Sequence, residues 1–335
     1  MTPFVLVSSG NGFIGSAVID RLRRRFPIVV LDAAPAEMPS GGIAWYQCEL
    51  ADPEKLSWSL ARAVQQFGPR IASVLHFAEE YTPSEPQHGV HTHSAVHVLK
   101  QLMQALQHYR PEQFIFASSP LEATGADGRR GNRNGSSADS SASSLQRTIR
   151  SESLLREQRG MIPLVLLRLS EVYDEQRLPA PLSLKIRRIY ERRWNSMFVS
   201  RRAPNARAFV HRQDVARSVE HAICRRGILE PEETFVISED QTVNDRELLQ
   251  QVAVLLHGHR TRVRHVPRVV EKLTASFEGS LTVDERPRSV AAVPRGNAGA
   301  TVDISRTIAR LDWRPRYRLE QCLQPMIEGL QSSPE

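Results

Sequence analysis

The 335-residue sequence predicts an α/β protein with a doubly wound parallel sheet. Short, continuously apolar runs recur along it, as expected of strands that a parallel sheet buries on both faces. A segment with helical apolar spacing, Val96, Leu99, Met103 and Leu106, lies between two of these runs. Alternating strands and helices are typical of this architecture. The predicted strands are 4–7, 28–31, 74–78, 114–117 and 164–169.

The first predicted strand leads directly into a glycine-rich turn. Gly10, Gly12 and Gly15 form a GxGxxG pattern, and the residues after the turn have helical spacing. Between a strand and a helix, this pattern permits a tight turn and a close approach of a pyrophosphate to the helix N-terminus. The sequence therefore predicts a Rossmann-type dinucleotide site. The loop residues expected at the cofactor are Ser9, Gly10, Asn11, Gly12, Phe13, Ile14 and Gly15.

An acidic residue follows the second predicted strand. Asp32 lies about 20 residues beyond the glycines, as the dinucleotide fingerprint requires. A carboxylate at this point accepts hydrogen bonds from both ribose hydroxyls and repels a 2'-phosphate. We therefore expect NAD as the cofactor in preference to NADP.

The composition predicts a soluble globular protein. Hydrophobic residues make up 41% of the chain, and no apolar run approaches the roughly 18 residues that a membrane helix needs. The N-terminus enters a core strand without a basic region or cleavage site, so we expect a cytoplasmic protein that is not exported. Cys48, Cys224 and Cys322 lie far apart, which argues against a disulfide framework or a zinc cluster.

The formal charge of +7 suggests an attraction to anions. Arginines are grouped at 21–25, 187–193 and 201–212. Three explanations compete: a nucleic-acid surface, a phosphate-bearing substrate, and solvated helix faces. The groups lack interleaved aromatic residues and no nucleic-acid module is recognisable, so solvated faces are favoured and nucleic acid is the weaker alternative.

Pattern changes along the chain suggest two domains. We assign residues 1–174, with 207–240 returning, to the Rossmann domain, and 175–206 with 241–335 to a smaller α/β substrate-binding lobe. Residues 126–144 contain no large apolar residue and are expected to form a flexible loop. Within the later part we expect an arginine-rich helix near 186–194, a strand at 234–237 and a helix opened by Asn244, with Glu247 completing a capping box.

Seven motifs follow one another along the chain: GNGFIG at 10–15, CELADPEKL at 48–56, LHFAE at 75–79, FIFASS at 114–119, LLRLSEVYD at 166–174, RAFVHRQDVA at 207–216 and the segment 303–323. In this order they resemble the extended short-chain dehydrogenase/reductase family, in its NAD-dependent epimerase/dehydratase group. The resemblance implies that Glu49 and Leu50 lie beside the adenine, and Phe77 and Ala78 near the cofactor. It also implies a homodimer formed by the helices after the fourth and fifth strands.

The catalytic positions implied by the resemblance are mostly altered. The family uses a Ser, an Asn, and a Tyr whose pKa a nearby Lys lowers, because a phenol must be acidified to exchange protons near neutral pH. Ser119 matches the Ser. The Asn, Tyr and Lys positions carry Ala95, Ser144 and Thr148, none of which can do that chemistry. Glu79 also stands where a small residue usually meets the cofactor.

No tyrosine between 126 and 166 can replace the missing one. Other candidate bases are Tyr81, Tyr173, His91 and Glu122, although packing or solvated roles are favoured for each. His88, His91, His93 and His97 cluster locally, but HExxH is absent and no third ligand is evident, so no metal site is expected.

Two functions remain open. The favoured one is an NAD-binding protein with impaired catalysis that serves in binding, sensing or assembly. The alternative is an active epimerase, dehydratase or reductase that uses Ser119 and a nonstandard base on a nucleotide-sugar or similar substrate. Tyr81, Tyr173 and Arg207 are the residues expected on the substrate side, where Arg207 could meet an anionic group.

Overall fold

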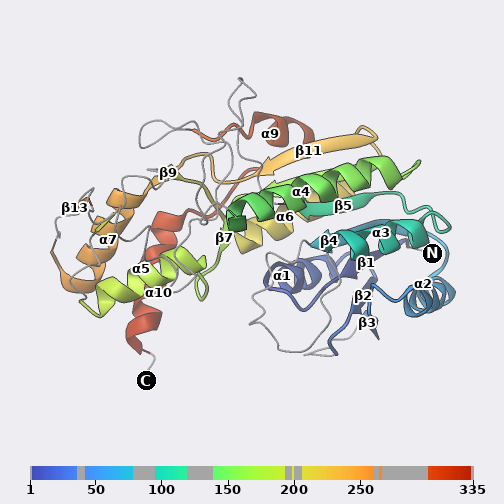
Figure 1. Cartoon of the computed structure of the whole chain (residues 1–335), viewed down its shortest axis with the longest axis horizontal. Helices are drawn as coiled ribbons and strands as arrows, with labels where there is room; N and C mark the ends of the chain where they lie inside the picture. The colour runs from blue at the N-terminus through green and yellow to red at the C-terminus, as the bar shows by residue number, and fades with distance from the viewer. Residues whose placement is uncertain are drawn as a thin grey trace.

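The computed structural model describes residues 2–35, 42–77, 95–118, 139–192, 198–199, 206–259, 264–265 and 301–332. Its centre is a seven-stranded sheet of order β11-β6-β5-β4-β1-β2-β3, in which every neighbouring pair is parallel (Figure 1). The chain order reverses between β1 and β4, so the predicted doubly wound sheet is confirmed. The strands are β1 (Phe4–Ser8), β2 (Ile28–Asp32), β3 (Ile43–Gln47), β4 (Ile71–Phe77), β5 (Phe114–Ser118), β6 (Leu164–Leu169) and β11 (Glu232–Ile237).

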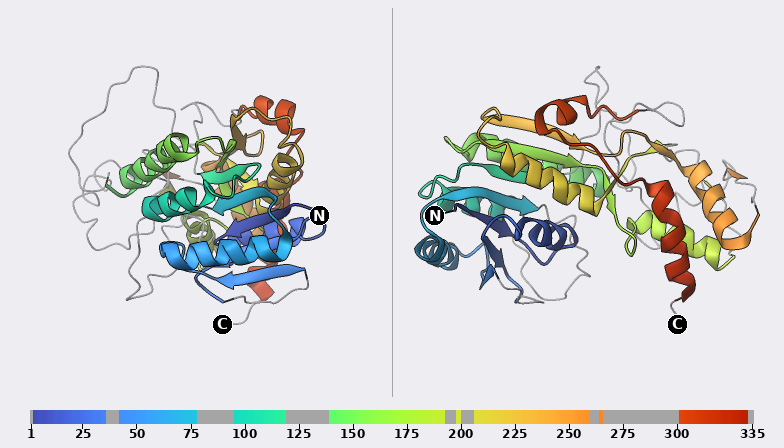
Figure 2. Two further views of the ribbon diagram at one scale, coloured as in Figure 1. Left: turned by 90° about the vertical axis from the view of Figure 1, so that its right-hand side faces the viewer. Right: turned by 180° about the vertical axis from the view of Figure 1, so that it is seen from behind.

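Helices cover both faces of this sheet (Figure 2). One face packs against α1 (Phe13–Leu22), α6 (Arg212–Cys224) and α9 (Ser305–Leu311). The other packs against α2 (Pro53–Phe67), α3 (Ala95–Leu106) and α4 (Asp139–Gln158). Alternate residues of a strand point to opposite faces, so Val5 and Val7 enter the first core while Phe4 and Leu6 enter the second. Both faces of the strand are therefore buried, as its apolar run predicted.

A third hydrophobic cluster lies at the end of the molecule away from β2 and β3 (Figure 1). It is built by α5 (Ala180–Tyr190), α7 (Asp245–His257) and α10 (Leu319–Ser332). Asn244 caps α7 as expected, with its side chain accepting a hydrogen bond from the Arg246 N–H at 2.8 Å. Three strand pairs accompany these helices: β7 (Glu171–Tyr173) with β10 (Phe209–His211), β9 (Ala206–Arg207) with β12 (Val243–Asn244), and β8 (Phe198–Val199) with β13 (Arg264–His265).

The boundaries differ from the expected ones at three points. The arginine-rich helix is α5, which ends at Tyr190 rather than continuing to 194. Helix α4 already begins at Asp139, so residues 139–144 of the expected flexible loop are helical, because extending a formed helix adds one hydrogen bond per residue. The rest of that loop, 126–138, lies outside the described residues.

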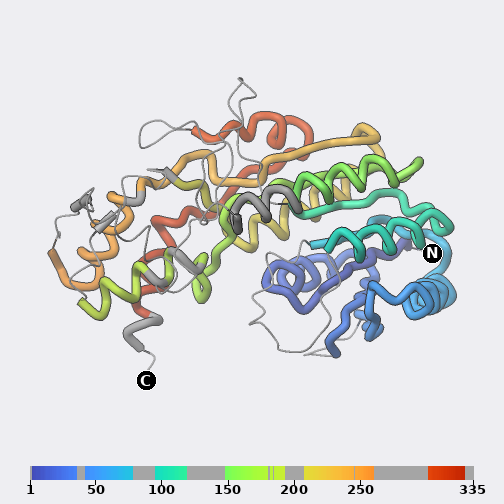
Figure 3. Tube along the Cα trace, viewed as in Figure 1, coloured from blue at the N-terminus to red at the C-terminus, as the bar shows by residue number. Residues whose placement is uncertain are grey.

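The third difference concerns the C-terminal segment. Residues 301–313 were expected in the smaller lobe, but Ile304, Leu311 and Trp313 belong to the core on the α1 and α6 face of the large sheet. The Trp313 indole N–H donates to the Asp214 carbonyl at 3.0 Å. The chain then crosses to α10 in the third cluster, as the tube in Figure 3 shows. Among the described residues, no helix is long and apolar enough to cross a membrane.

Candidate functional site at the carboxyl edge of the sheet

The glycine loop between β1 and α1 is tightly packed. A Cβ at Gly10 would lie 2.5 Å from the Val30 side chain, and one at Gly15 would lie 2.7 Å from the Gly10 carbonyl oxygen. Both distances are shorter than carbon atoms tolerate, so only glycine fits at these two positions. Ser9 adopts a φ of 62°, in the left-handed region that disfavours side chains. The loop therefore approaches the helix as closely as the GxGxxG pattern predicted.

The N-terminus of α1 is open to an anion. Gly12 is the N-cap residue, no side chain of the described residues makes a capping hydrogen bond there, and the first turn contains no acidic residue. The first N–H groups of a helix lack partners within the helix and carry a partial positive charge. Helix α1 thus presents uncapped amide donors at the carboxyl edge of the sheet.

Two arginines add positive charge beside this helix end. The guanidinium carbons of Arg177 and Arg212 lie 5.0 Å and 4.9 Å from the centre of the Phe13 ring, and Phe13 is the first residue of α1. Arg212 donates to Asp174 at 2.9 Å, but its buried Nε atom has no partner among the described residues. Among the residues that the structure describes, no carboxylate forms an ion pair with the guanidinium of Arg177, which is exposed. This pair was not singled out from the sequence.

Asp32 ends β2 directly beside the glycine loop. Its Oδ2 accepts the Asn11 backbone N–H and its Oδ1 accepts the Ala34 N–H, both at 3.0 Å. The Asn11 side chain in turn donates to the Pro35 carbonyl at 3.1 Å. A carboxylate offers about four acceptor positions, so Asp32 retains capacity for ligand hydroxyls.

A hollow of about 130 Å³ opens at the ends of β1, β2 and β4. Ser9, Asp32, Glu49 and Leu50, all expected at the cofactor, line it together with Ala95, at the position where the resemblance places an Asn. The side chains of Phe77 and Ile14, two further residues expected at the cofactor, belong to the hydrophobic core. The remaining residues that line the hollow, which were not singled out from the sequence, are Ala33, Cys48, His76 and Val98.

His76 is a neutral polar side chain in the wall of this hollow. Ser8 Oγ donates to the Leu75 carbonyl at 3.0 Å, so the 2.7 Å contact between Ser8 Oγ and His76 Nδ1 requires Nδ1 to carry the ring proton. The ring stacks on Phe116, and burial lowers the pKa of His76 to about 4. It is therefore uncharged at neutral pH.

Helix α4 brings the altered catalytic positions toward the same edge. Glu152 accepts hydrogen bonds from Ser118 Oγ at 3.1 Å and from Arg168 at 2.8 Å, at the ends of β5 and β6. Thr148 is buried one helical turn before Glu152, on the same helix face. Ser144 belongs to this helix, but its side chain is outside the described part of the structure.

Tyr173 is unsuited to the role of replacement base. It is fully buried, and its hydroxyl donates to Glu239 Oε1 at 2.9 Å. Burial, followed by the negative charge of Glu239, raises the pKa of Tyr173 far above its ordinary value. A base near neutral pH requires the opposite shift.

Arg207 is a neutralised cation rather than an open one. Only 2% of its side chain is exposed, and its guanidinium donates to Glu171 through Nε at 3.0 Å and Nη2 at 2.6 Å. The guanidinium also lies 5.6 Å from the centre of the Phe209 ring. An anionic substrate would have to compete with the Glu171 carboxylate for this residue.

Comparison with known protein families shows which family the chain belongs to. The model of the NAD-dependent epimerase/dehydratase family matches residues 5–238. The chain belongs to this family. The match includes the glycine loop, Asp32 and the strands that border the hollow. Membership of the epimerase/dehydratase family supports a nicotinamide cofactor. A search of curated proteins gave no match.

Solved structures share the fold of this epimerase/dehydratase family member at low sequence identity. WbmG of Bordetella bronchiseptica, solved with NAD and UDP, is 18% identical, with 98% of this chain and 93% of that one covered and a TM-score of 0.64. The UDP-glucose 4-epimerase of Thermus thermophilus, solved with NAD, is 20% identical, with coverages of 98% and 99% and a TM-score of 0.59. That of Thermotoga maritima, solved with UDP-glucose, is 17% identical, with both coverages 98% and a TM-score of 0.61.

Several residues singled out in the sequence lie outside the part of the chain that the structure describes. They lie in 78–94 and 119–138, outside the described residues, so their roles stay predictions. These positions are Ala78, Glu79, Tyr81, His88, His91, His93, Ser119 and Glu122.

Proposed function

We propose that this family member binds NAD but lacks the family's tyrosine–lysine chemistry, and that it serves in binding, sensing or assembly. The observation that carries the proposal is the face of α4 at the carboxyl edge of the sheet. There the position expected to hold a lysine is the buried Thr148, one turn from the Glu152 and Ser118 hydrogen bond. A threonine carries no positive charge, so it cannot lower the pKa of a phenol as a lysine does.

The residues at the glycine loop fit a dinucleotide. Gly10 and Gly15 allow the tight turn, the uncapped end of α1 offers amide donors, and Arg177 and Arg212 lie beside it. These features favour a pyrophosphate at the helix end. In this family the bound cofactor supplies the chemistry of hydride transfer. In this chain the residues of the glycine loop and the two arginines would hold and orient the cofactor.

Asp32 supports the preference for NAD over NADP. Its carboxylate is fixed by the Asn11 and Ala34 amides beside the hollow. A 2'-phosphate would bring further negative charge against this fixed carboxylate.

We also propose that the Rossmann domain dimerises through α3 and α4, for which sedimentation velocity is the direct measurement.

The chemistry of the substrate side supports impaired catalysis. Tyr173 is held as a hydrogen-bond donor with a raised pKa, and Arg207 is paired with Glu171. Neither residue offers a base or an open anion receptor. The alternative is an active enzyme that uses Ser119 with a base outside the described residues. It is favoured only by the glycine loop and Asp32, which keep the features of a dinucleotide site.

Calorimetric titration with NAD, NADH and NADP tests the binding half of the proposal. Saturable binding of NAD, with NADP much weaker and the discrimination lost in Asp32→Asn, is expected. Failure to bind any dinucleotide would contradict it.

The catalytic half is tested by a screen of nucleotide-sugars for NADH formation or epimerised product. Turnover that Ser119→Ala abolishes would establish the active alternative instead.

A further inference from the structure

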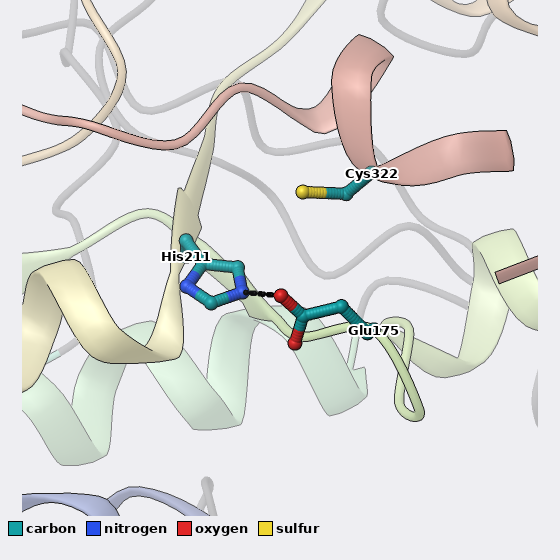
Figure 4. Close-up of side chains that lie close together, drawn as sticks. All are labelled: Glu175, His211 and Cys322. Atoms are coloured by element: carbon teal, nitrogen blue, oxygen red, sulfur yellow. Dashed lines mark ion pairs between the residues drawn. The ribbon is translucent and has the colours of Figure 1, made fainter. Parts of the chain in front are cut away.

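Three side chains from distant parts of the sequence converge near the junction of β7, β10 and α10. Glu175 follows β7, His211 ends β10, and Cys322 lies near the start of α10 (Figure 4). One oxygen, nitrogen or sulfur atom from each lies within 4.8 Å of the other two. His211 Nε2 and Glu175 Oε1 are 3.3 Å apart.

The imidazole at the centre of this cluster is rigid and incompletely bonded. His211 is 1% exposed, and its buried Nε2 has no hydrogen-bond partner among the described residues. Its ring is stacked on Tyr317 with centres 4.0 Å apart and meets the edge of Tyr173 at 5.2 Å. These contacts fix the ring plane, so Nε2 is held pointing toward Glu175 (Figure 4). A buried ring nitrogen that makes no hydrogen bond is costly unless a ligand satisfies it.

We propose that Glu175, His211 and Cys322 bind one zinc ion, with water as the fourth ligand. Imidazole nitrogen, thiolate sulfur and carboxylate oxygen are the three donor types that zinc uses in proteins, whereas magnesium and calcium require oxygen donors. Cys322 and His211 are buried, but Glu175 is half exposed. The exposed carboxylate gives the ion a path from solvent.

The spacing of the ligand atoms is close to that of a tetrahedral site. Zinc bonds of roughly 2.0 to 2.3 Å put neighbouring ligand atoms about 3.3 to 3.8 Å apart. The His211 to Glu175 distance of 3.3 Å already meets this requirement. The sulfur lies no more than 4.8 Å from the other two atoms, so a shift on the order of 1 Å by the Cys322 side chain completes the site.

Metal binding changes the tautomer of His211. In the free protein Nδ1 accepts the Gln213 N–H at 3.2 Å, which leaves the ring proton on Nε2. Zinc at Nε2 moves that proton to Nδ1 and breaks the hydrogen bond that caps α6. Loss of one capping bond costs roughly tenfold in affinity. The thiol proton of Cys322 is released to solvent as the thiolate forms.

A zinc ion here would join three segments of the chain. It would tie α10 to the loop after β7 and to the start of α6, near the buried Tyr173. Such a clamp is independent of the proposed dinucleotide site, because none of its ligands lines the hollow beneath Asp32. Absence of NAD binding and absence of zinc binding are therefore separate results.

Cobalt substitution of tag-free, metal-stripped protein is the decisive experiment. Cobalt(II) takes the same tetrahedral sites and gives a sulfur-to-metal charge-transfer band when a thiolate is bound. We expect one equivalent to bind with this band present. Cys322→Ser should abolish the band, while Cys224→Ser, at an exposed cysteine remote from the cluster, should retain it. A spectrum without the band, or one lost in Cys224→Ser instead, overturns the assignment.

Zinc titration with a competing chelator gives the second measurement. Glu175→Gln, on the exposed side of the cluster, preserves side-chain shape and should leave the metal-free melting temperature unchanged. It should weaken zinc binding at least tenfold, since loss of even an outer partner costs about 10- to 100-fold. Zinc should raise the melting temperature of the wild type and of Cys224→Ser only. Equal zinc affinity in the wild type and Glu175→Gln would refute the proposed ligand set.

Discussion

The Tyr173 hydroxyl and the Glu239 carboxylate form a buried hydrogen bond of 2.9 Å between β7 and the segment after β11. The same Glu239 oxygen accepts the Leu319 N–H at 3.1 Å, at the first residue of α10. Burial raises the pKa of Glu239 to about 7, and the hydrogen bonds from Tyr173 and Leu319 only partly offset this rise. A group that titrates near neutral pH thus anchors the C-terminal helix.

We expect Glu239 to make the protein less stable as the pH rises toward 7. Its pKa in the folded state, about 7, lies above the ordinary 4.5, so between these values the folded state holds a proton that the unfolded state has lost. This stabilisation is complete below about pH 4.5 and is lost by about pH 7, a change of up to about 3 kcal/mol. In Glu239→Gln the amide needs no proton, so urea unfolding from pH 4.5 to 8 should show the variant gaining stability relative to the wild type.

Glu233 provides the matched control for this prediction. It is equally buried, and burial alone would raise its pKa, but hydrogen bonds from Arg306 and Arg310 outweigh this and lower it. Its stabilisation is present above its ordinary pKa and is lost as the pH falls. The stability difference for Glu233→Gln should therefore stay nearly constant from pH 4.5 to 8 and should change only at lower pH. Parallel slopes for the two variants would show that Glu239 is not the titrating group.

Gly15→Ala should disrupt the glycine loop. The new methyl group would lie 2.7 Å from the Gly10 carbonyl and 3.0 Å from that of Ser9, both backbone atoms. We expect a loss of about 1–3 kcal/mol in the free energy of unfolding, and weaker NAD binding. Gly227→Ala is the control, because a Cβ there meets open space. Calorimetric melting and NAD titration of both variants would separate the two cases, and a stable Gly15→Ala that binds NAD normally would contradict the loop packing.

Ser9→Gly should stabilise the protein. Ser9 has a φ of 62°, where a side chain costs about 1–2 kcal/mol, while the greater freedom of glycine in the unfolded chain returns part of this. The expected net gain is roughly 0.5–1 kcal/mol in chemical denaturation. Arg110→Gly, with a φ of 44° outside the glycine loop, should give a similar gain without affecting NAD affinity. A loss of stability in Ser9→Gly would mean that its side chain has a compensating role.

Arg177→Gln should weaken NAD binding. Its guanidinium carbon lies 5.0 Å from the Phe13 ring centre at the open end of α1, so the change removes positive charge from the proposed pyrophosphate site. A charged hydrogen bond of about 1.5 kcal/mol corresponds to about a tenfold loss of affinity. Arg24→Gln removes the same charge beyond the opposite end of α1 and should have little effect. Titration at two salt concentrations tests this; equal losses in both variants would indicate a general electrostatic effect.

Local pattern was sufficient to predict most of the sheet. The run Phe4 to Val7 is buried along its whole length, Leu164 to Leu169 is buried at every position except Arg168, and the positions of β1, β2, β4, β5 and β6 are confirmed. The edge strand β3 was missed, because only Tyr46 within it is buried and the strand shows no continuous buried run. Ser9 and Asp32, predicted from the glycine-loop fingerprint, and Glu49 and Leu50, implied by the family resemblance, line one hollow. That a dinucleotide binds there stays a prediction.

Contacts between distant residues were beyond local pattern. The pairing of Arg207 with Glu171 depends on β7 and β10 being neighbours, which nothing within either segment indicates. The approach of Cys322 to His211 likewise depends on how α10 docks after the chain leaves the large sheet. The position of His76 in the wall of the hollow was not predicted either, because it depends on the contact of its ring with Ser8 in another strand.

The position of Trp313 has a consequence for how this protein is made. Its indole and Leu311 complete the core beside α6, although they are encoded about 75 residues after β11 ends. During synthesis the cofactor-binding half therefore emerges first but stays unfinished until almost the entire chain has left the ribosome. A premature stop near residue 300 would leave an apolar surface uncovered on the domain that was translated earliest. Late truncations should consequently be cleared by quality control rather than survive as a smaller dinucleotide-binding protein.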